Sequence, residues 1–261
     1  NVLVGTASVD ELCGRAVSLA QRWLGFERIG IWLREPDDPE HFHGTFGIDE
    51  LGKVRDERHR VIDIDPEVLA WAARGASTPI TTHRGALYND RSQVVGQGPW
   101  MRALLWDGDA FAGMVSVDRH LSGEPLSGRD GDLLTLYAST LSNLIFRKRA
   151  ETKLEAREAF YRTIFQNTGT AMLVVNADTS VALANEECER LLGYTADELQ
   201  REVQGVSDLI EPSRVAVVLG YHRARRQGDP AVPTRFESQA LDRAGNVRDV
   251  VVQVRMIPGS D

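Results

Sequence analysis

Residues 129–167 read RDGDLLTLYASTLSNLIFRKRAETKLEAREAFYRTIFQN, and this stretch organises the rest of the chain. Between Arg129 and Phe165 it contains no Pro, and its only Gly, Gly131, falls in the first turn. Ser127 and Asp130 have the spacing of an acidic capping box, which marks a helix N-terminus. We therefore expect one helix over residues 129–165, roughly 55 Å long at about 1.5 Å per residue.

The two halves of this predicted helix differ in composition. The first half has an apolar stripe that is too broad for a helix surrounded by water, so it should pack on a domain. The middle, RKRAETKLEARE, is charged and should be solvated. A heptad pattern that is apolar at both ends and polar in the centre favours a coiled coil in a homodimer, and a charged spacer between independent domains is the alternative. The interface residues predicted on this basis are Tyr137, Leu141, Leu144, Leu154 and Tyr161.

Length and composition limit the class of protein. A chain of 261 residues is long enough for two domains, and 42% hydrophobic with 26% charged residues is the balance of a soluble globular protein. The net charge of -8 argues against a surface that binds nucleic acid or adsorbs to a membrane. The chain has no Met at its start, and we expect it to be a piece of a longer protein.

Cysteine content and apolar runs suggest a cytoplasmic location. Cys13 and Cys188 are the only cysteines and lie far apart, so neither a disulfide framework nor a zinc site is expected. The apolar runs are much shorter than the roughly 20 residues that cross a bilayer, and no signal peptide is visible.

The region before residue 128 shows helix and strand patterns that indicate an antiparallel sheet. A capping box at Ser8 opens a helix that Gly25 ends. We expect a third strand within residues 53–64, a short helix over 66–74, a short strand over 78–82 and a Gly-rich loop over 83–99. The other expected strands are Glu27–Arg34, His41–Ile48, Trp100–Trp106 and Ala110–Arg119, the last two joined by Asp107-Gly108-Asp109.

This first region resembles GAF domains. The resemblance is carried by RALLWDGDAFAGMVSVDRH, by the following PLSGRDGDLLTLYASTLSNLI, and by LGFERIGIWL near the start. It implies a central antiparallel sheet with the first and last helices on one side and a ligand pocket, or its remnant, on the other. Bilin-binding members carry a Cys near the pocket, whereas Cys13 lies in the first helix, and the signature of cyclic-nucleotide-binding members is not visible.

If the pocket takes a ligand, its predicted lining is aromatic and borne by loops. Trp71, Tyr88, Trp100 and Trp106 would suit a planar molecule, and the alternative is that they are core and rim residues of an empty fold. His41 and His43 share one strand face, but two histidines without a third ligand do not make a metal site, so none is predicted.

The region after residue 159 resembles PAS domains. The resemblance spans Phe160–Ile257 and is carried by FYRTIFQNTGTAMLVVNADTSVALANEECERLLGYTADELQ and by ALDRAGNVRDVVVQV. Family members have a further strand, in the middle of the sheet, after the position of Pro258. Either the sequence has been trimmed, a partner chain supplies that strand, or the neighbouring hairpin moves over.

The PAS resemblance also bears on cofactors, which stay unknown. Cys188 is misplaced for the photoactive flavin class. Haem-binding relatives use a His on the long helix, and His222 follows Val215 and Val218 on the face expected to point inward. The alternative is that His222 caps the helix or packs at the edge of the core.

The sequence thus predicts an α+β fold of two domains. Residues 1–128 form a GAF-like sensor, 129–165 a linker helix, and 166–261 a PAS-like domain lacking its last strand. No catalytic motif is present, so no enzyme is expected within these residues. The predicted function is a sensory module of a bacterial signalling protein, such as a histidine kinase or diguanylate cyclase of a two-component type system. The alternatives are a ligand-free dimerisation scaffold and a haem-type sensor through His222.

Overall fold

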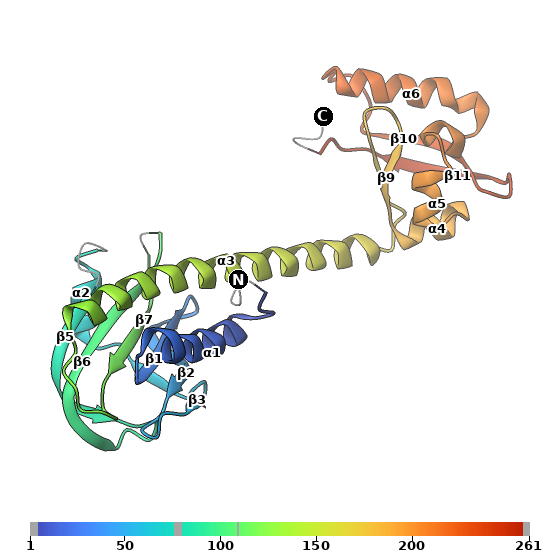
Figure 1. The fold of residues 1–261 in the computed structure, drawn as a ribbon. Coiled ribbons are helices and arrows are strands. Elements are labelled where there is room, and N and C mark those ends of the chain that lie inside the picture. The colour runs from blue at the N-terminus through green and yellow to red at the C-terminus, as the bar shows by residue number, and fades with distance from the viewer. Residues whose placement is uncertain (1–4, 76–79, 109, 258–261) are drawn as a thin grey trace. The chain divides into compact units, whose positions relative to one another are not determined.

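The computed structural model describes residues 5–75, 80–108 and 110–257 (Figure 1). The chain divides into two compact units, Asn1–Leu154 and Glu155–Asp261, called here the first and the second unit. Each contains antiparallel strands and helices, and the long helix α3, Gly128–Gln166, contributes residues to both. The predicted fold class is confirmed. The boundary between the units falls within α3, whereas the sequence placed its boundaries at the two ends of that helix.

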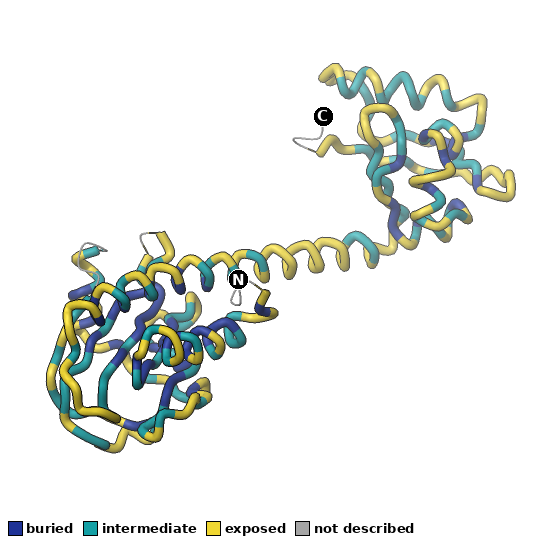
Figure 2. Tube along the Cα trace, viewed as in Figure 1, coloured by how far each residue is buried: buried dark blue, intermediate teal, exposed yellow. Residues whose placement is uncertain are grey.

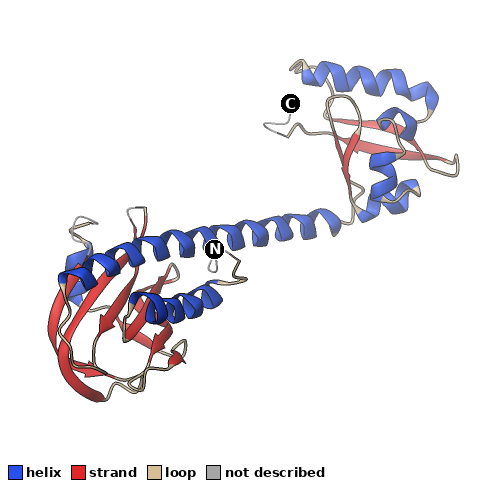
Figure 3. Ribbon diagram, in the orientation of Figure 1, coloured by secondary structure: helices blue, strands red, loops and turns tan. Residues whose placement is uncertain are grey.

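The first unit is built on one seven-stranded sheet in the order β3-β2-β1-β7-β6-β5, with β4 also paired to β2 (Figure 3). All of these pairs are antiparallel. The strands are β1 Arg28–Glu35, β2 Asp38–Ile48, β3 Val54–Asp56, β4 Val61–Asp63, β5 Ile80–Tyr88, β6 Val94–Asp107 and β7 Ala110–Asp118.

Two expectations for these strands were wrong. Residues 53–64 hold two short strands, β3 and β4, instead of one, because both pair with successive parts of the long strand β2. The Gly-rich loop expected over 83–99 is mostly strand: β5 and β6 pair continuously from Ile80↔Ala103 to Leu87↔Gly96. Glycines such as Gly85 and Gly98, which face each other across this hairpin, hid the alternation of side chains. The turn expected at Asp107–Asp109 includes Asp109, which lies outside the described residues.

Helix ends in the first unit follow the predicted caps. The helix α1, Val9–Leu19, starts where the Ser8 side chain accepts a hydrogen bond from the Glu11 amide, and it continues as a π-helix, η1 Ala20–Leu24, before Gly25 at φ 73°. At the start of α3, the Asp130 carboxylate accepts a hydrogen bond of 2.7 Å from the Ser127 amide. The short helix α2, Pro66–Ala72, begins with Pro at its first position.

The two faces of this sheet carry separate hydrophobic cores. On one face, α1 and α3 cover alternate residues of the central strands, and the cluster includes Leu12, Ile31, Val115, Leu134 and Leu141. On the other face, α2 covers a smaller cluster around Trp32, Trp71, Leu104 and Met114. Figure 2 shows that the buried residues of the first unit are concentrated in the central strands and in the helices that pack against them. The predicted arrangement, with the first and last helices on one side of the sheet, is confirmed.

The second unit contains two separate two-stranded sheets and four short or medium helical segments. A core around Val181, Cys188, Leu192 and Leu199 joins the first sheet to the helices. Its elements are β8 Leu173–Val175, β9 Val181–Ala184, α4 Glu186–Leu192, α5 Ala196–Arg201, the 3-10 helix η2 Val206–Leu209, α6 Pro212–Arg226, β10 Arg235–Leu241 and β11 Val247–Gln253.

Asn185 and Thr195 explain where the helices of the second unit begin. The Asn185 side chain accepts from the Cys188 amide at 3.0 Å and donates to the Phe165 carbonyl at 2.9 Å, so it caps α4 and also holds the end of α3. Thr195 and Glu198 have the sequence spacing of a capping box, and they form a complete one at the start of α5. No residue of α6 is fully buried, but Val215, Val218 and His222, on the face predicted to point inward, are half-buried.

Candidate ligand site

A cavity of about 400 Å³ lies in the first unit, on the sheet face opposite α1 and α3. Its size falls in the range of small-molecule sites. Residues from β1, β5, β6 and β7 line it, together with the segment that connects β3 to β4. The lining residues that the argument below uses are Arg28, Gly30, Trp32, Glu57, Arg60, Tyr88, Trp100, Arg102, Ser116 and Asp118.

The register of the sheet places these residues in two rows. Arg28 pairs with Asp118, which pairs with Trp100 on the next strand. Two residues further along, Gly30 pairs with Ser116, and Ser116 pairs with Arg102. Because side chains two apart on a strand share a face, both rows lie on the cavity side of the sheet. The next row, Trp32, Met114 and Leu104, already belongs to the apolar core beneath α2.

Arg28 is buried, with 8% of its surface exposed. One guanidinium nitrogen, Nη2, donates to the Tyr88 carbonyl at 2.6 Å, and Nη1 lies 3.5 Å from the Asp118 carboxylate. Its Nε and Nη1 groups make no hydrogen bond within the described residues. Burial raises the pKa of Asp118 above its usual value, although the nearby Arg28 charge opposes this. Arg28 therefore keeps unused donors beside the cavity.

Arg102 is the second cation of the site, and it is half-buried. Its guanidinium stacks on the Trp100 ring at 4.1 Å from the ring centroid, and no ion pair of Arg102 is found among the described residues. The Nε group of Arg102 and the hydroxyl of Thr81, its partner in the β5–β6 pairing, are buried without a hydrogen-bond partner in that part of the chain. Burial lowers the pKa of Arg102, and the negative charges of Asp65 and Glu67 offset this only in part.

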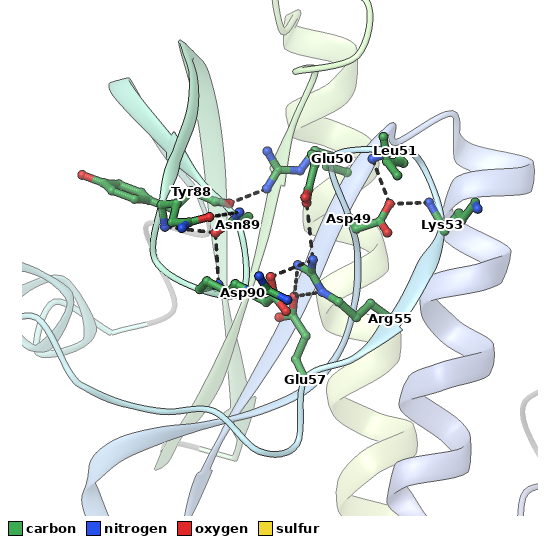
Figure 4. Close-up of polar contacts among 12 residues, drawn as sticks. Asp49, Glu50, Leu51, Lys53, Arg55, Glu57, Tyr88, Asn89 and Asp90 are labelled. Atoms are coloured by element: carbon green, nitrogen blue, oxygen red, sulfur yellow. Dashed lines mark hydrogen bonds and ion pairs between the residues drawn. The ribbon is translucent and has the colours of Figure 1, made fainter.

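One wall of the cavity is formed by β3 and the turn that follows it, and a network of ion pairs stabilises this wall. Arg55 contacts Glu57 at 2.7 Å, Asp90 at 3.2 Å and Glu50 at 3.4 Å, so it joins β3 to the turn between β5 and β6 (Figure 4). Arg60 lies 3.5 Å from Glu57 and stacks 4.8 Å from the centroid of the Trp32 ring. Glu57 thus contacts two arginines, which balance its negative charge.

The four aromatic residues predicted as a ligand lining separate into two pairs. Tyr88 and Trp100 line the cavity, from strands and not from loops, and Tyr88 is 53% exposed. In Figure 4 the Tyr88 ring points away from the Arg55 network. Trp71 and Trp106 lie instead in or against the apolar core beneath α2, so the structure does not bring all four together.

Sequence reasoning missed the charged half of this site. Arg28, Arg60, Arg102 and Asp118 were not singled out as candidates, although they supply most of its polar groups. The available signal was a pair of arginines at strand positions that alternate with core residues, Arg28 before Ile29 and Arg102 after Met101. That signal identifies a sheet face, but only the pairing register shows that both arginines share it.

His41 and His43 do share one face, as expected, and both contact the same carboxylate. His41 Nδ1 lies 2.6 Å and His43 Nε2 lies 2.9 Å from Asp38. The hydrogen bond to Asp38 raises the pKa of His41. Within the described ranges, no group of three or more histidine, cysteine or acidic residues is arranged to hold a metal ion.

His222 is half-buried on α6, and its Nε2 lies 3.2 Å from the Ala177 carbonyl. This contact agrees better with a His222 side chain that packs at the edge of the core than with one that is free to bind haem iron. Both cysteine thiols are buried and free, and burial raises the pKa of Cys188 to about 11 and that of Cys13 to about 12. Thiols with such pKa values stay protonated at neutral pH and are weak nucleophiles.

The predicted dimer residues on α3 need a correction. Leu141 is 2% exposed, and Tyr137 and Leu144 pack against the same core, so these three side chains serve the first unit itself. Burial also raises the pKa of the Tyr137 hydroxyl. Leu154 and Tyr161, by contrast, are 58% and 54% exposed. The predicted heptad pattern therefore runs through two different parts of α3, a first half that packs on the sheet and a second half that is exposed.

No helix among the described residues has the length and apolar character needed to span a membrane. No curated protein is similar to the chain.

Several solved structures are similar to it at low identity. A methyl-accepting chemotaxis protein, residues 122 to 287, has 15% identity and a TM-score of 0.45, covering 57% of this chain and 95% of that one. The GAF domain of an Acinetobacter phosphoenolpyruvate-protein phosphotransferase has 10% identity and a TM-score of 0.42, covering 58% and 90%. The E. coli DhaR(N)-DhaL complex has 12% identity and a TM-score of 0.45, covering 95% and 82%.

A family model matches most of the second unit. The family model described as PAS fold matches residues 159–257, which confirms the PAS resemblance of this region.

Proposed function

We propose that the chain is a sensory module of a signalling protein, in which a small molecule in the cavity of the first unit alters the state of α3. The observation that carries this proposal is that β1, β6 and β7 have the cavity on one face and α3 on the other. Arg102 lines the cavity, for example, whereas its neighbours Met101 and Ala103 belong to the core that holds α3.

In this arrangement the sheet directly connects the cavity to α3. Successive residues of a strand point to opposite faces, so a ligand that moves Arg28 or Arg102 also moves the backbone of Ile29 or Met101. Interiors are closely packed and respond to small shifts, and α3 contributes Leu134, Ala138, Leu141 and Ile145 to that interior. A ligand can then bias α3 between two arrangements by binding one of them better.

The exposed part of α3 is the proposed output of this change. Residues 152–164 are all exposed, including the apolar side chains Leu154, Phe160, Tyr161 and Ile164. A helical segment of this length without tertiary contacts is marginal in water. We expect a second copy of the chain to cover it as a coiled coil. The receiving region is expected outside residues 1–261, in a cytoplasmic protein of the histidine kinase or diguanylate cyclase type.

Native mass spectrometry of matched variants tests the pairing. Leu154→Lys should convert a dimer to a monomer, because it places a charge in the proposed interface. Leu51→Lys is the control, since Leu51 is 72% exposed and lies in a turn of the first unit, outside α3. A wild-type monomer at all concentrations, or a dimer that survives Leu154→Lys, would contradict the paired helix.

Hydrogen exchange tests the sensory role itself. Purified protein is first examined by native mass spectrometry for a co-purified small molecule, and exchange along α3 is then compared with the cavity filled and empty. We expect slower exchange in residues 152–164 when the cavity is filled. A ligand that binds without changing α3 would favour the alternative function, a dimerisation scaffold that transmits no signal.

A further inference from the structure

We propose that the cavity of the first unit takes a small organic anion, a carboxylate or a phosphate ester joined to an apolar body. This inference names the ligand class for the site on which the proposed function rests. It starts from the charges and unused donors of the cavity.

The first argument is the balance of charge. Three guanidinium groups line the cavity, Arg28, Arg60 and Arg102, against two carboxylates, Glu57 and Asp118. Glu57 is closer to Arg55, which is outside the lining, than to Arg60, and Asp118 is opposite Arg28. The described lining therefore has one more positive than negative charge, and Arg102 is the cation without a carboxylate partner.

The second argument is the cost of leaving buried donors unused. Buried polar groups normally have hydrogen-bond partners, and an unpaired buried charge is costly. Arg28 has two such groups and Arg102 has one, with the Thr81 hydroxyl next to it in the sheet. An anion that accepts hydrogen bonds from both arginines would satisfy them together.

The third argument is that the donors are already positioned. Arg102 lies over the Trp100 ring and Arg60 lies over the Trp32 ring. A guanidinium held over a ring keeps N–H groups that can reach an acceptor. Gly30 and Ser116 occupy the row between Arg28 and Trp32 with small side chains, and the Trp32 indole lies close to Gly30.

The rest of the lining selects the remainder of the ligand. Ile48, Ile62, Leu87 and Met114 border the same cavity and offer an apolar surface to a hydrocarbon or ring. A cation would be repelled by the excess positive charge, and a neutral molecule would leave that charge unbalanced. The lining thus favours an acid with an apolar body over either.

Binding of matched probes tests this inference on the whole chain. Benzoate and phenyl phosphate are compared with neutral benzamide and with cationic benzylamine by thermal shift and calorimetry at equal concentrations and ionic strength. At least one anion should bind about tenfold or more tightly than benzamide, as expected for hydrogen bonds to charged groups. If neither anion binds more tightly than benzamide, or if benzylamine binds best, the inference is overturned.

The comparison of benzoate with phenyl phosphate separates carboxylate from phosphate ligands, and variants then locate the site. Arg102→Gln should weaken binding of the better anion about tenfold, whereas Arg102→Lys should retain part of it. Arg91→Gln is the control, since Arg91 is exposed and does not line the cavity. Equal losses in Arg102→Gln and Arg91→Gln would show a non-specific charge effect and overturn the assignment to this cavity.

The same samples distinguish failure of this inference from failure of the proposed function. An anion that binds in an Arg102-dependent manner without changing hydrogen exchange in α3 supports the ligand class and contradicts signalling. A neutral molecule that binds and changes α3 contradicts the ligand class and leaves the sensory role standing.

Discussion

The two faces of the sheet in the first unit use the same strands for different purposes. On the helix-covered face, Ile31, Leu105 and Val115 are fully buried among other apolar side chains. On the opposite face, the apolar core around Trp32 gives way within four residues along each strand to Arg28, Arg102 and Asp118. Stability is concentrated on one face, and the other keeps buried charges that a stable core would exclude. Such a conflict with local rules is typical of functional sites.

Truncation on the helix-covered face should have the largest effect. Leu134→Ala is expected to lower the free energy of unfolding of the first unit by about 3 kcal/mol, because it removes buried methyl groups and leaves a cavity. Leu136→Ala on the same helix is the control, with Leu136 68% exposed, and should change it by about 0.5 kcal/mol or less. Urea denaturation followed by tryptophan fluorescence measures both. Equal losses would mean that α3 does not pack as described.

On the cavity face, a substitution should raise the free energy of unfolding instead of lowering it. Arg102→Met is expected to raise the free energy of unfolding by about 0.5–1 kcal/mol, because it removes a half-buried cation that has no ion pair among the described residues while keeping an apolar chain over Trp100. The same denaturation measures this gain, and the anion-binding assay should show weaker binding. A large loss of stability would indicate that Arg102 is structural and would remove the contrast between the faces.

The smallest effect concerns the pair of histidines at Asp38. The hydrogen bond to Asp38 raises the pKa of His41 above 6.5 in the folded protein, so its stabilising contribution is complete below pH 6.5 and is lost as pH rises through the folded pKa. The melting temperature of the first unit should therefore fall slightly over this window. Asp38→Asn should weaken that component and lower the His41 pKa, measured by NMR, while Asp63, 3.3 Å from His41 Nε2, keeps part of the shift. An unchanged pKa would contradict the contact.

The sequence predicted those features that depend on neighbouring residues. The caps at Ser8, Ser127 and Thr195 follow from local hydrogen bonding and are present. The hairpin β10–β11 follows from side-chain alternation and a turn, which are local signals as well. These signals need no knowledge of distant parts of the chain, which is why they could be read directly.

The features that depend on pairing between distant segments were not predictable in the same way. The strands β5 and β6 contain Gly85, Gly96 and Gly98, so their strand character comes from pairing and not from side-chain alternation. The site has the same origin. Arg28 and Arg102 are brought together only because both strands pair with β7, at Asp118 and Ser116. The division of α3 into a packed and an exposed half likewise required the position of the sheet.

Gly30 has a consequence for how this site could diversify. A Cβ at that position would approach the Trp32 indole nitrogen at 3.3 Å and the Ser116 hydroxyl at 3.5 Å, which requires only small adjustments. Replacing Gly30 by Ala or Ser would therefore raise the cavity floor without dismantling the sheet. A single substitution could thereby change the volume of this cavity.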